Sequence, residues 1–502
     1  MQQPEEDRTT SAASHADNAP ANETRARVRE AVERDWNDVR EHPRREVSPV
    51  PAYLALAAAF ALGFVLGRQF FLGAARPPRR GPRTDPGRAT TWVPATAAPR
   101  APADIVPGRR YKLRFRGTEA MEAAFAAARP AGVATVSRRR AVASAVAMMG
   151  TAGYPTDLHA FRRRFDVEVV EDYQYQVELG GPMSADESAP DDGAGPSLDD
   201  VLEAIGARNA WTQTRGAGVA LAVVDTGIDG TRAEFADARR VGCWPADAGE
   251  AWVDPVGHGT MAACIAAASR KAGGAFDGVA PEAGLIACRT EFFDTELMDI
   301  YDYLADLAKG GMRIVASNSF GMEAGTPPDL VGQDFPYALA DAVEAGVVAV
   351  FSAGNNHHLT GGDPDGDDPN SIWLYKSRAD VLTVGACKLD GTMWHYSSRG
   401  PGQDHAGEGN ARKPDVVAPT PENGRVLYGS ATRALPNGWG TSGACAQGAG
   451  LAALLWSLKP DLGRDELFEL IRSTAARLSA GPNAQGHGRI DCAAAVRAAA
   501  RN

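Results

Sequence analysis

The chain has 502 residues, of which 44% are hydrophobic and 23% are charged, so it can bury a large core and form more than one domain. Its formal net charge of −11 gives no support to a function in nucleic-acid binding, because phosphate backbones attract basic surfaces. The six cysteines include no CxxC pair, and this number is compatible with disulfides and equally with free buried thiols.

The N-terminal part contains one long apolar stretch. Residues 1–48 are polar, with Arg and Glu interspersed, and predict a solvated helix or disorder. Within residues 49–75, the segment Val50–Gly67 has 18 residues without a charge, which is the length of a short transmembrane helix. A buried soluble helix is the alternative, but the flanking sequence contains no domain that could bury it. We therefore predict a membrane contact through residues 50–72.

The apolar segment also predicts where in the cell the protein is located. The segment Val39–Arg68 loosely resembles the anchors of small bacterial membrane-tethered proteins, which favours a single-pass protein of the bacterial inner membrane. Arginines flank both ends of the apolar stretch, with more of them on the C-terminal side. The positive-inside rule therefore weakly favours a cytoplasmic location of the remaining chain, and the side stays open.

A small α+β domain is predicted next, at residues 110–180. The preceding residues, 76–109, are rich in Pro, Arg and Ala and predict an extended linker. Alternating side chains predict strands at Tyr111–Arg116 and Phe165–Asp172. Alanine-rich stretches between them, such as Ala141–Met149, predict helices.

The remainder of the chain predicts an α/β fold. Residues 181–198 form an acidic flexible linker, and Ser197 begins a helix that continues through Ile205. In residues 199–502, apolar runs alternate with helical patterns, which indicates a doubly wound parallel sheet with flanking helices. The predicted strands are Val219–Val224, Gly284–Ala287, Ile314–Ala316, Val347–Phe351 and Val381–Val384, and the predicted helices include Leu297–Lys309, Tyr337–Ala345 and Gly448–Trp456.

Three motifs carry the residues of a serine nucleophile and its partners. Asp225 follows a predicted strand in DTGID, His258 lies in GHGT before an alanine-rich run, and Ser442 lies in GTSGA before another. Serine needs a base within hydrogen-bond reach, and that base needs an orienting carboxylate. Each motif alone has an ordinary structural explanation, such as a turn, a structural histidine or a helix cap. A fourth motif, SAGNN, places the amide of Asn355 after a strand, where it can donate to an oxyanion.

The combined motifs resemble the subtilisin-like (S8) serine peptidase family over about 300 residues, from roughly Asp200 onwards. The resemblance implies a subtilisin-like fold, with Asp225, His258 and Ser442 as the catalytic triad and Asn355 as the oxyanion donor. The substrate-binding residues that it implies are Ser319, Phe320, Gly321, Ser352, Ala353 and Gly354. Two positions depart from the family pattern, because Gly443 and Ala446 stand where the family usually has a bulkier residue and a proline.

The implied function is that of a serine endopeptidase that hydrolyses peptide bonds through an acyl-enzyme. Its partners would be protein or peptide substrates, and its chemistry would need no cofactor. The domain at residues 110–180 looks like an inhibitory propeptide of the I9 type, which would make the chain a membrane-tethered zymogen. An unrelated accessory domain remains an alternative for this part. A non-catalytic binding module and an esterase with the same triad remain alternatives for the whole chain.

An acidic loop indicates a calcium site. Asp363, Asp365 and Asp367 lie in GDPDGDD, and closely spaced oxygen ligands suit Ca²⁺. The full EF-hand pattern fails because Leu374 stands where its glutamate would be. A solvated acidic loop explains the sequence equally well.

Overall fold

The computed structural model describes part of the chain, all of it within the compact unit Trp92–Asn502. The described residues are 109–128, 133–137, 139–146, 158–177, 189–190, 193, 195–322, 334–357, 371–372, 374–402 and 412–501. Among these residues, no helix is long and apolar enough to cross a bilayer. The predicted segments 1–48 and 49–75, with the membrane contact at 50–72, lie outside the described residues, as does most of the predicted linkers 76–109 and 181–198.

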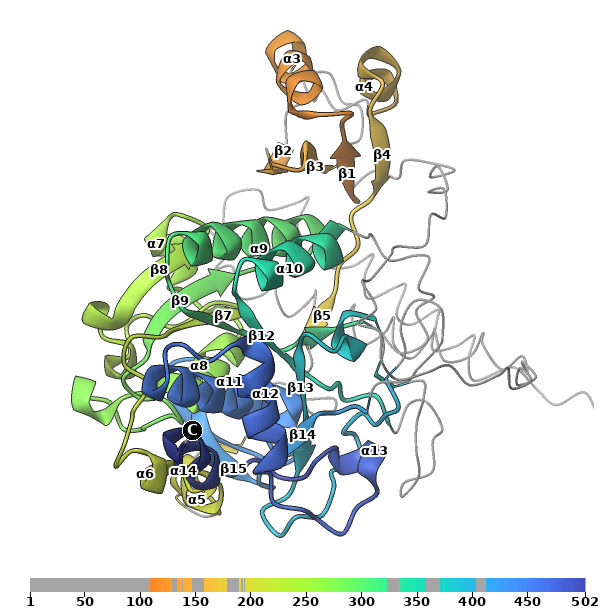
Figure 1. Ribbon diagram of the computed structural model, residues 1–502. Helices are drawn as coiled ribbons and strands as arrows, with labels where there is room; N and C mark the ends of the chain where they lie inside the picture. The colour runs from red at the N-terminus through yellow and green to blue at the C-terminus, as the bar shows by residue number, and fades with distance from the viewer. Residues whose placement is uncertain are drawn as a thin grey trace, which may run out of the picture. The chain divides into compact units, whose positions relative to one another are not determined.

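A parallel sheet of seven strands organises the C-terminal part of the chain, in the order β14-β13-β12-β10-β7-β9-β8 (Figure 1). The strands are β7 (Ala220–Asp225), β8 (Arg240–Trp244), β9 (Gly284–Arg289), β10 (Ile314–Asn318), β12 (Val348–Ser352), β13 (Leu382–Cys387) and β14 (Val416–Pro419). All neighbouring pairs are parallel, so the predicted parallel α/β sheet is confirmed. The strand order reverses at β7, which makes the adjacent carboxyl edge the expected ligand site.

Helices cover both faces of this sheet, and alternate residues of β7 show why. Leu221 and Val223 pack into one core, with the helices α8, α11, α12 and α14. Ala222 and Val224 pack into the other core, with α9 and α10. Successive side chains of a strand point to opposite faces, so the continuous apolar run predicted there fills both cores. The bounds are α8 (His258–Ala267), α9 (Asp294–Lys309), α10 (Asp334–Glu344), α11 (Gly440–Leu458), α12 (Arg464–Ser473) and α14 (Cys492–Arg501).

A second, antiparallel sheet lies in the N-terminal part of the described chain, in the order β2-β3-β1-β4. The strands of this sheet are β1 (Arg110–Arg114), β2 (Val133–Ser137), β3 (Val142–Val146) and β4 (Glu168–Glu171). The helix α3 (Thr118–Ala128) lies between β1 and β2 in the chain, and α4 (Leu158–Phe165) lies between β3 and β4. The helix predicted at Ala141–Met149 is therefore wrong, since β3 lies there. Ala143 and Ala145 are buried in the core and face β1, so tertiary pairing overrides the local preference of alanine for helix.

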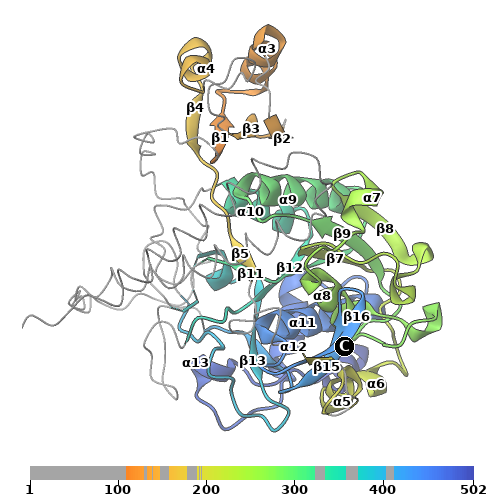
Figure 2. The ribbon, with the colours of Figure 1, turned by 180° about the vertical axis from the view of Figure 1, so that it is seen from behind.

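Two short pairings join this part to the remainder of the chain. The strand β5 (Gln176–Val177) pairs antiparallel with β11 (Phe320–Gly321) (Figure 2). The strand β6 (Ala189–Pro190) pairs with β16 (Ala431–Leu435), which in turn pairs with β15 (Gly424–Tyr428). The remaining short elements are α5 (Leu198–Ala204), α6 (Ala207–Ala210), α7 (Ala248–Ala251) and α13 (Pro482–Gln485), with 3-10 turns at 233–235, 237–239, 270–272 and 374–377.

Candidate active site

Asp225 and His258 form a buried pair. Asp225 is the last residue of β7, and His258 is the first residue of α8. The Nδ1 atom of His258 lies 2.7 Å from Oδ1 of Asp225, and both side chains are about 1% exposed. The same Oδ1 accepts the backbone N–H of Thr226 at 2.8 Å. A carboxylate against Nδ1 keeps the proton on that nitrogen, so the Nε2 atom is the basic end of the imidazole.

Glycine allows the two halves of this pair to approach. A Cβ atom at Gly259 would collide with the carbonyl oxygen of Gly227 and would lie 3.0 Å from Cβ of Asp225. The backbone N–H of Gly259 donates to Oγ1 of Thr226 at 2.9 Å. The GHGT motif therefore packs directly on the DTG turn, and a side chain at Gly259 would separate His258 from Asp225.

The carboxylate of Asp254 accepts hydrogen bonds from both the DTG turn and the GHGT segment. The sequence did not identify this residue as part of the site. Its Oδ1 atom accepts the hydroxyl of Thr226 at 2.8 Å and the N–H of Gly257 at 2.7 Å. Its Oδ2 atom accepts the N–H and the hydroxyl of Thr260, at 2.8 and 2.6 Å. An aspartate shortly before a helix is a known capping signal, and this signal could have identified Asp254.

Ser442 and Asn355 form a second group. Ser442 is the third residue of α11, where the helix N-terminus favours negative charge, and it is fully buried. The Oδ1 atom of Asn355 accepts the N–H and the hydroxyl of Thr441, both at 3.0 Å. Gly354 donates its N–H to the same hydroxyl at 3.2 Å. Because Oδ1 of Asn355 is the accepting end of the amide, Nδ2 is the donating end.

Packing explains why glycine follows this serine. A Cβ atom at Gly443 would lie 2.5 Å from Cβ of Trp439 and 3.2 Å from Cδ1 of Ile265 in α8. The side chain of Trp439, the N-cap residue of α11, therefore excludes the bulkier residue that the family usually has, and Ile265 narrows the same space. Ala446, at the usual proline position, is fully buried, and α11 runs through it without interruption.

The predicted substrate strand lies beside Ser442. The hydroxyl of Ser319 donates to the carbonyl oxygen of Ser442 at 3.5 Å. The next two residues, Phe320 and Gly321, pair antiparallel with Val177 and Gln176. This strand therefore already binds an extended segment of the chain itself.

The other predicted substrate-binding residues lie at the end of β12. Ser352 donates its hydroxyl to the carbonyl oxygen of Asn318 at 3.3 Å, and Ala353 donates its N–H to the carbonyl oxygen of Val384 at 2.9 Å. The carbonyl oxygen of Gly354 accepts the N–H of Ser398 at 2.8 Å. These bonds hold the backbone that leads into Asn355.

The predicted calcium ligands Asp363, Asp365 and Asp367 lie outside the described residues. Within the described part of the chain, no group of three or more His, Cys, Asp or Glu side chains could hold a metal ion. The calcium site stays a prediction.

Both groups of residues lie at the carboxyl edge of the parallel sheet. β7 ends at Asp225, β10 ends beside Ser319, and β12 leads into Asn355. This edge, beside the reversal of strand order, is where open α/β sheets bind ligands. A buried Asp–His pair and a serine at a helix N-terminus are the types of group that serine hydrolases use.

The comparison with known proteins identifies the family. The model of the subtilase family, peptidase S8, matches residues 216–488, which is more than half of the chain. The chain therefore belongs to the subtilase family, and the resemblance noted in the sequence is confirmed.

Individual relatives agree with this assignment. The calcium-dependent protease of Nostoc sp. is 29% identical over 314 residues, which cover 56% of this chain and 45% of that protein. The chain thus spans about half the length of that relative. Serine protease AprX of Bacillus subtilis is 30% identical over 336 residues, which cover 59% of this chain and 70% of that protein.

A solved structure supports the fold alone. Fervidolysin from Fervidobacterium pennivorans, a keratinolytic enzyme related to subtilisin, matches with a TM-score of 0.54 and 20% identity. The match covers 78% of this chain and 61% of that chain.

Proposed function

We propose that the chain is a serine endopeptidase with the triad Asp225, His258 and Ser442. The observation that carries this proposal is the 2.7 Å contact between Nδ1 of His258 and Oδ1 of Asp225, in a chain of the subtilase family. Nδ1 is thereby committed to the carboxylate, which leaves Nε2 to act as the general base.

The proposed reaction has two stages. The hydroxyl oxygen of Ser442 attacks the scissile carbonyl carbon, and Nε2 of His258 takes the hydroxyl proton. Nδ2 of Asn355 and the backbone N–H of Ser442 donate to the oxyanion, and one such donor contributes roughly 3–4 kcal/mol to the transition state. His258 then protonates the leaving amine, and water hydrolyses the acyl-enzyme. No cofactor takes part in these steps.

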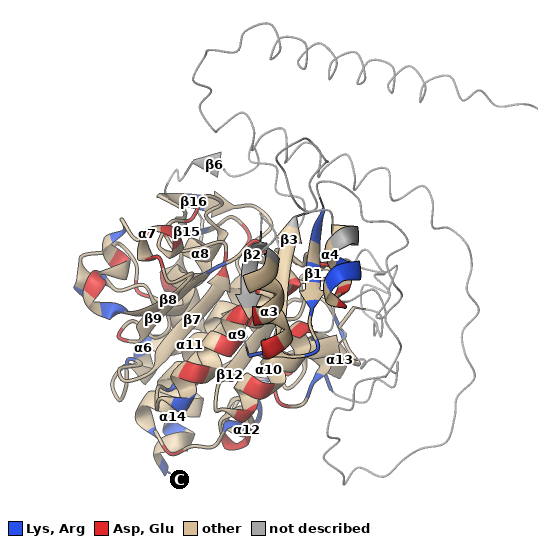
Figure 3. Cartoon of the chain, turned by 90° about the horizontal axis from the view of Figure 1, so that it is seen from above, with Lys and Arg blue, Asp and Glu red and all other residues tan. Residues whose placement is uncertain are grey.

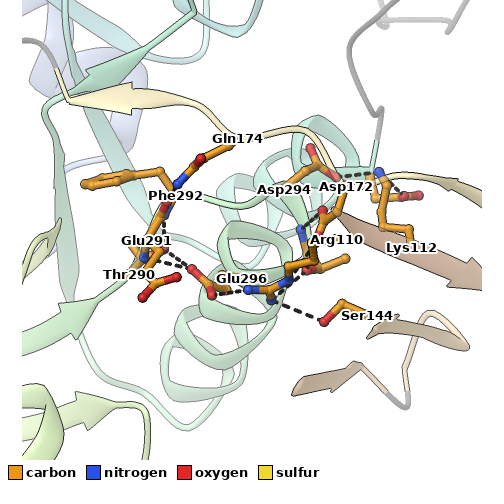
Figure 4. A network of polar contacts seen from close by, with 12 residues as sticks. Arg110, Lys112, Ser144, Asp172, Gln174, Thr290, Glu291, Phe292, Asp294 and Glu296 are labelled. Atoms are coloured by element: carbon orange, nitrogen blue, oxygen red, sulfur yellow. Dashed lines mark hydrogen bonds and ion pairs between the residues drawn. The ribbon is translucent and has the colours of Figure 1, made fainter. Parts of the chain in front are cut away.

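We further propose that the N-terminal α+β domain is an inhibitory propeptide. Its basic side chains form ion pairs with acidic side chains of α9 and α10. Figure 3 colours the basic residues of β1 blue and the acidic residues of α9 and α10 red. Arg110 pairs with Glu296 at 2.7 Å, in a network of buried polar contacts (Figure 4). Arg140 pairs with Asp302 at 3.0 Å and with Asp341 at 2.6 Å. Opposite charges across a largely buried surface favour a specific complex.

The segment that follows β4 supports the inhibitory role. Tyr175 donates its N–H to the carbonyl oxygen of Phe292 at 2.9 Å, and Gln174 forms an antiparallel bridge with Phe293. On the other side, β5 pairs with β11. An extended peptide between two strand edges has the geometry of substrate binding by β-augmentation. In this arrangement, the segment excludes other peptides from the same edge.

Self-processing would then occur between Val177 and Ala189. Each of these residues is held by its own pairing, Val177 with Phe320 and Ala189 with Ala434. The bond would lie in or beside the acidic linker at residues 181–198. We propose that the uncut chain is tethered to the membrane through residues 50–72 and that processing separates the protease from this anchor.

Expression of the full chain tests both proposals. The wild-type chain should yield a new N-terminus between residues 177 and 189, read by mass spectrometry, and should then digest casein. Ser442→Ala should stay uncut and inactive. Ser457→Ala is the matched control, because this serine lies in the last turns of the same helix and binds only remote groups, Thr214 and Ala217.

A further inference from the structure

Tyr175 is enclosed by residues of the catalytic part of the chain. Its side chain is 1% exposed, and its ring lies 5.9 Å from Phe320, 5.6 Å from Phe335 and 6.0 Å from Tyr375, measured between centroids. All three contacts are edge-to-face, which is a favourable arrangement for aromatic pairs. We call these three rings, together with Asp294, the tyrosine enclosure.

The enclosure contains one carboxylate, and Tyr175 donates its hydroxyl to that group. The hydroxyl oxygen lies 3.0 Å from Oδ1 of Asp294, whose side chain is 0% exposed. The same Oδ1 accepts the N–H of Phe335 at 3.3 Å, and Oδ2 accepts Nζ of Lys112 at 2.8 Å. Burial raises the pKa of Tyr175 well above its ordinary value, so the hydroxyl keeps the proton that it donates.

The backbone places this tyrosine at a defined distance from the reacting serine. Tyr175 is two residues before Val177, which lies opposite Phe320 in the antiparallel pairing. Ser319, the residue before Phe320, contacts the backbone of Ser442 at 3.5 Å. A substrate residue opposite Ser319 would therefore present its carbonyl to Ser442. Counted back from that residue, the position of Tyr175 is the fourth on the N-terminal side of the scissile bond.

We propose that the processed protease selects substrates with tyrosine at this fourth position, and that Asp294 is the residue that distinguishes tyrosine from phenylalanine. The inference rests on the proposed peptidase function and specifies its substrate class. In the uncut chain, Tyr175 itself fills the tyrosine enclosure, in the place that a substrate tyrosine would take.

The chemistry of a buried carboxylate supports this selection. Phenylalanine would fill the ring space but would leave Oδ1 of Asp294 with the N–H of Phe335 and without its hydroxyl donor, and the loss of a hydrogen bond to a buried polar group is costly. Departure of the N-terminal domain also removes Lys112, so the substrate hydroxyl becomes more important to Asp294. A lysine or arginine would satisfy the charge, but it would place a flexible aliphatic chain against rings that suit an aromatic side chain.

The test compares fluorogenic peptides that differ only at the fourth position, which carries tyrosine, phenylalanine or arginine. With the processed protease obtained from the full chain, kcat/KM for the tyrosine peptide should exceed that for the phenylalanine peptide by about tenfold to a hundredfold. In Asp294→Asn, this ratio should fall to within about threefold. Asp299→Asn is the matched control on the same helix, since Asp299 accepts the indole N–H of Trp244 in β8 at 3.3 Å; it should keep the wild-type ratio.

Each outcome decides a different point. Equal rates for tyrosine and phenylalanine, or a preference for arginine, would overturn the selection by Asp294. Cleavage of none of the peptides would instead count against the proposed peptidase function.

A second measurement needs no catalysis and no processing. In the uncut Ser442→Ala chain, Tyr175→Phe should increase the opening of residues 173–177, read by amide hydrogen exchange, by about tenfold. The increase should disappear when Asp294→Asn is also present, because the hydroxyl then has no carboxylate to bind. An equal increase in both backgrounds would contradict the role of Asp294.

Discussion

Lys112 of the N-terminal domain and Asp294 of α9 form an ion pair of 2.8 Å in which both side chains are 0% exposed. The same Nζ atom lies 2.8 Å from Oδ2 of Asp334 in α10. Burial lowers the pKa of Lys112, but the two carboxylates outweigh burial and the net shift is upward. This lysine therefore joins the N-terminal domain to the two helices that cover one face of the catalytic sheet.

The first prediction concerns this lysine. Lys112→Met leaves two carboxylates without their shared cation, and removing one partner of a buried pair costs about 3–5 kcal/mol. In the Ser442→Ala background, hydrogen exchange of β1 should therefore accelerate strongly. The matched control is Arg116→Met, because Arg116 pairs with Asp166 at the surface, with exposures of 81% and 75%. Equal exchange rates in the two variants would contradict the role given to Lys112.

The second prediction is a pH optimum for docking of the N-terminal domain. Burial opposes ionisation of Asp334, but Lys112 and Arg114 prevail and lower its pKa to about 2. Its contribution is present above pH 4 and is lost as the pH falls towards 2. Burial raises the pKa of Asp172 to about 6, although Lys112 and Arg110 oppose this shift. As the pH falls through 6, Asp172 therefore takes up a proton in the docked state, and docking becomes more favourable.

The two shifts together predict that docking is strongest near pH 4 to 5. Exchange of β1 amides in the Ser442→Ala chain, corrected for the intrinsic pH dependence of exchange, measures this. Protection that rises steadily from pH 4 to pH 8 would contradict the sign assigned to Asp172.

The third prediction concerns Asp254. Asp254→Ala removes five hydrogen bonds, one to Val256 and four that connect the Asp225 turn with Gly257 and the first turn of α8. We expect kcat to fall by about tenfold to a hundredfold with KM nearly unchanged, because His258 loses its position relative to Ser442. Asp247→Ala is the control, since Asp247 caps the separate helix α7 by accepting the N–H of Gly249. A change in KM alone would argue against a positioning role.

The fourth prediction tests the glycine after the serine. Gly443→Ala places a Cβ atom 2.5 Å from Cβ of Trp439, and we expect a loss of about 2–3 kcal/mol in the free energy of unfolding. Gly481→Ala should be nearly neutral, because nothing lies within 4 Å of the added atom. Thermal unfolding of both variants measures the difference. Equal melting temperatures would show that Trp439 can shift away from the added atom at no cost.

The sequence predicted local features of the fold better than contacts between distant residues. The apolar run Val219–Val224 corresponds closely to β7, and Ser197 caps α5 with Asp200 accepting its backbone N–H at 2.7 Å. These features depend on neighbours in the chain. The helix predicted at Ala141–Met149 failed because the pairing of β3 with β1 outweighs alanine composition.

In the candidate site, too, the sequence predicted residues in local motifs better than residues whose partners are distant in the chain. Motifs identified Asp225 and His258, and the structure pairs them. Asp294 was not identified, because its partners Lys112 and Tyr175 are 182 and 119 positions away in the chain. Periodicity and short motifs do not predict contacts between residues so far apart in the sequence. These residues come together only in the folded structure.

Labelling with a fluorophosphonate probe tests the central claim most directly. The probe reacts with a serine only when a base activates its hydroxyl. We predict that the processed wild-type chain and Ser457→Ala are labelled and that Ser442→Ala is not. Labelling that persists in Ser442→Ala, or no labelling of the wild-type chain after limited proteolysis has removed the N-terminal domain, would contradict the proposed triad.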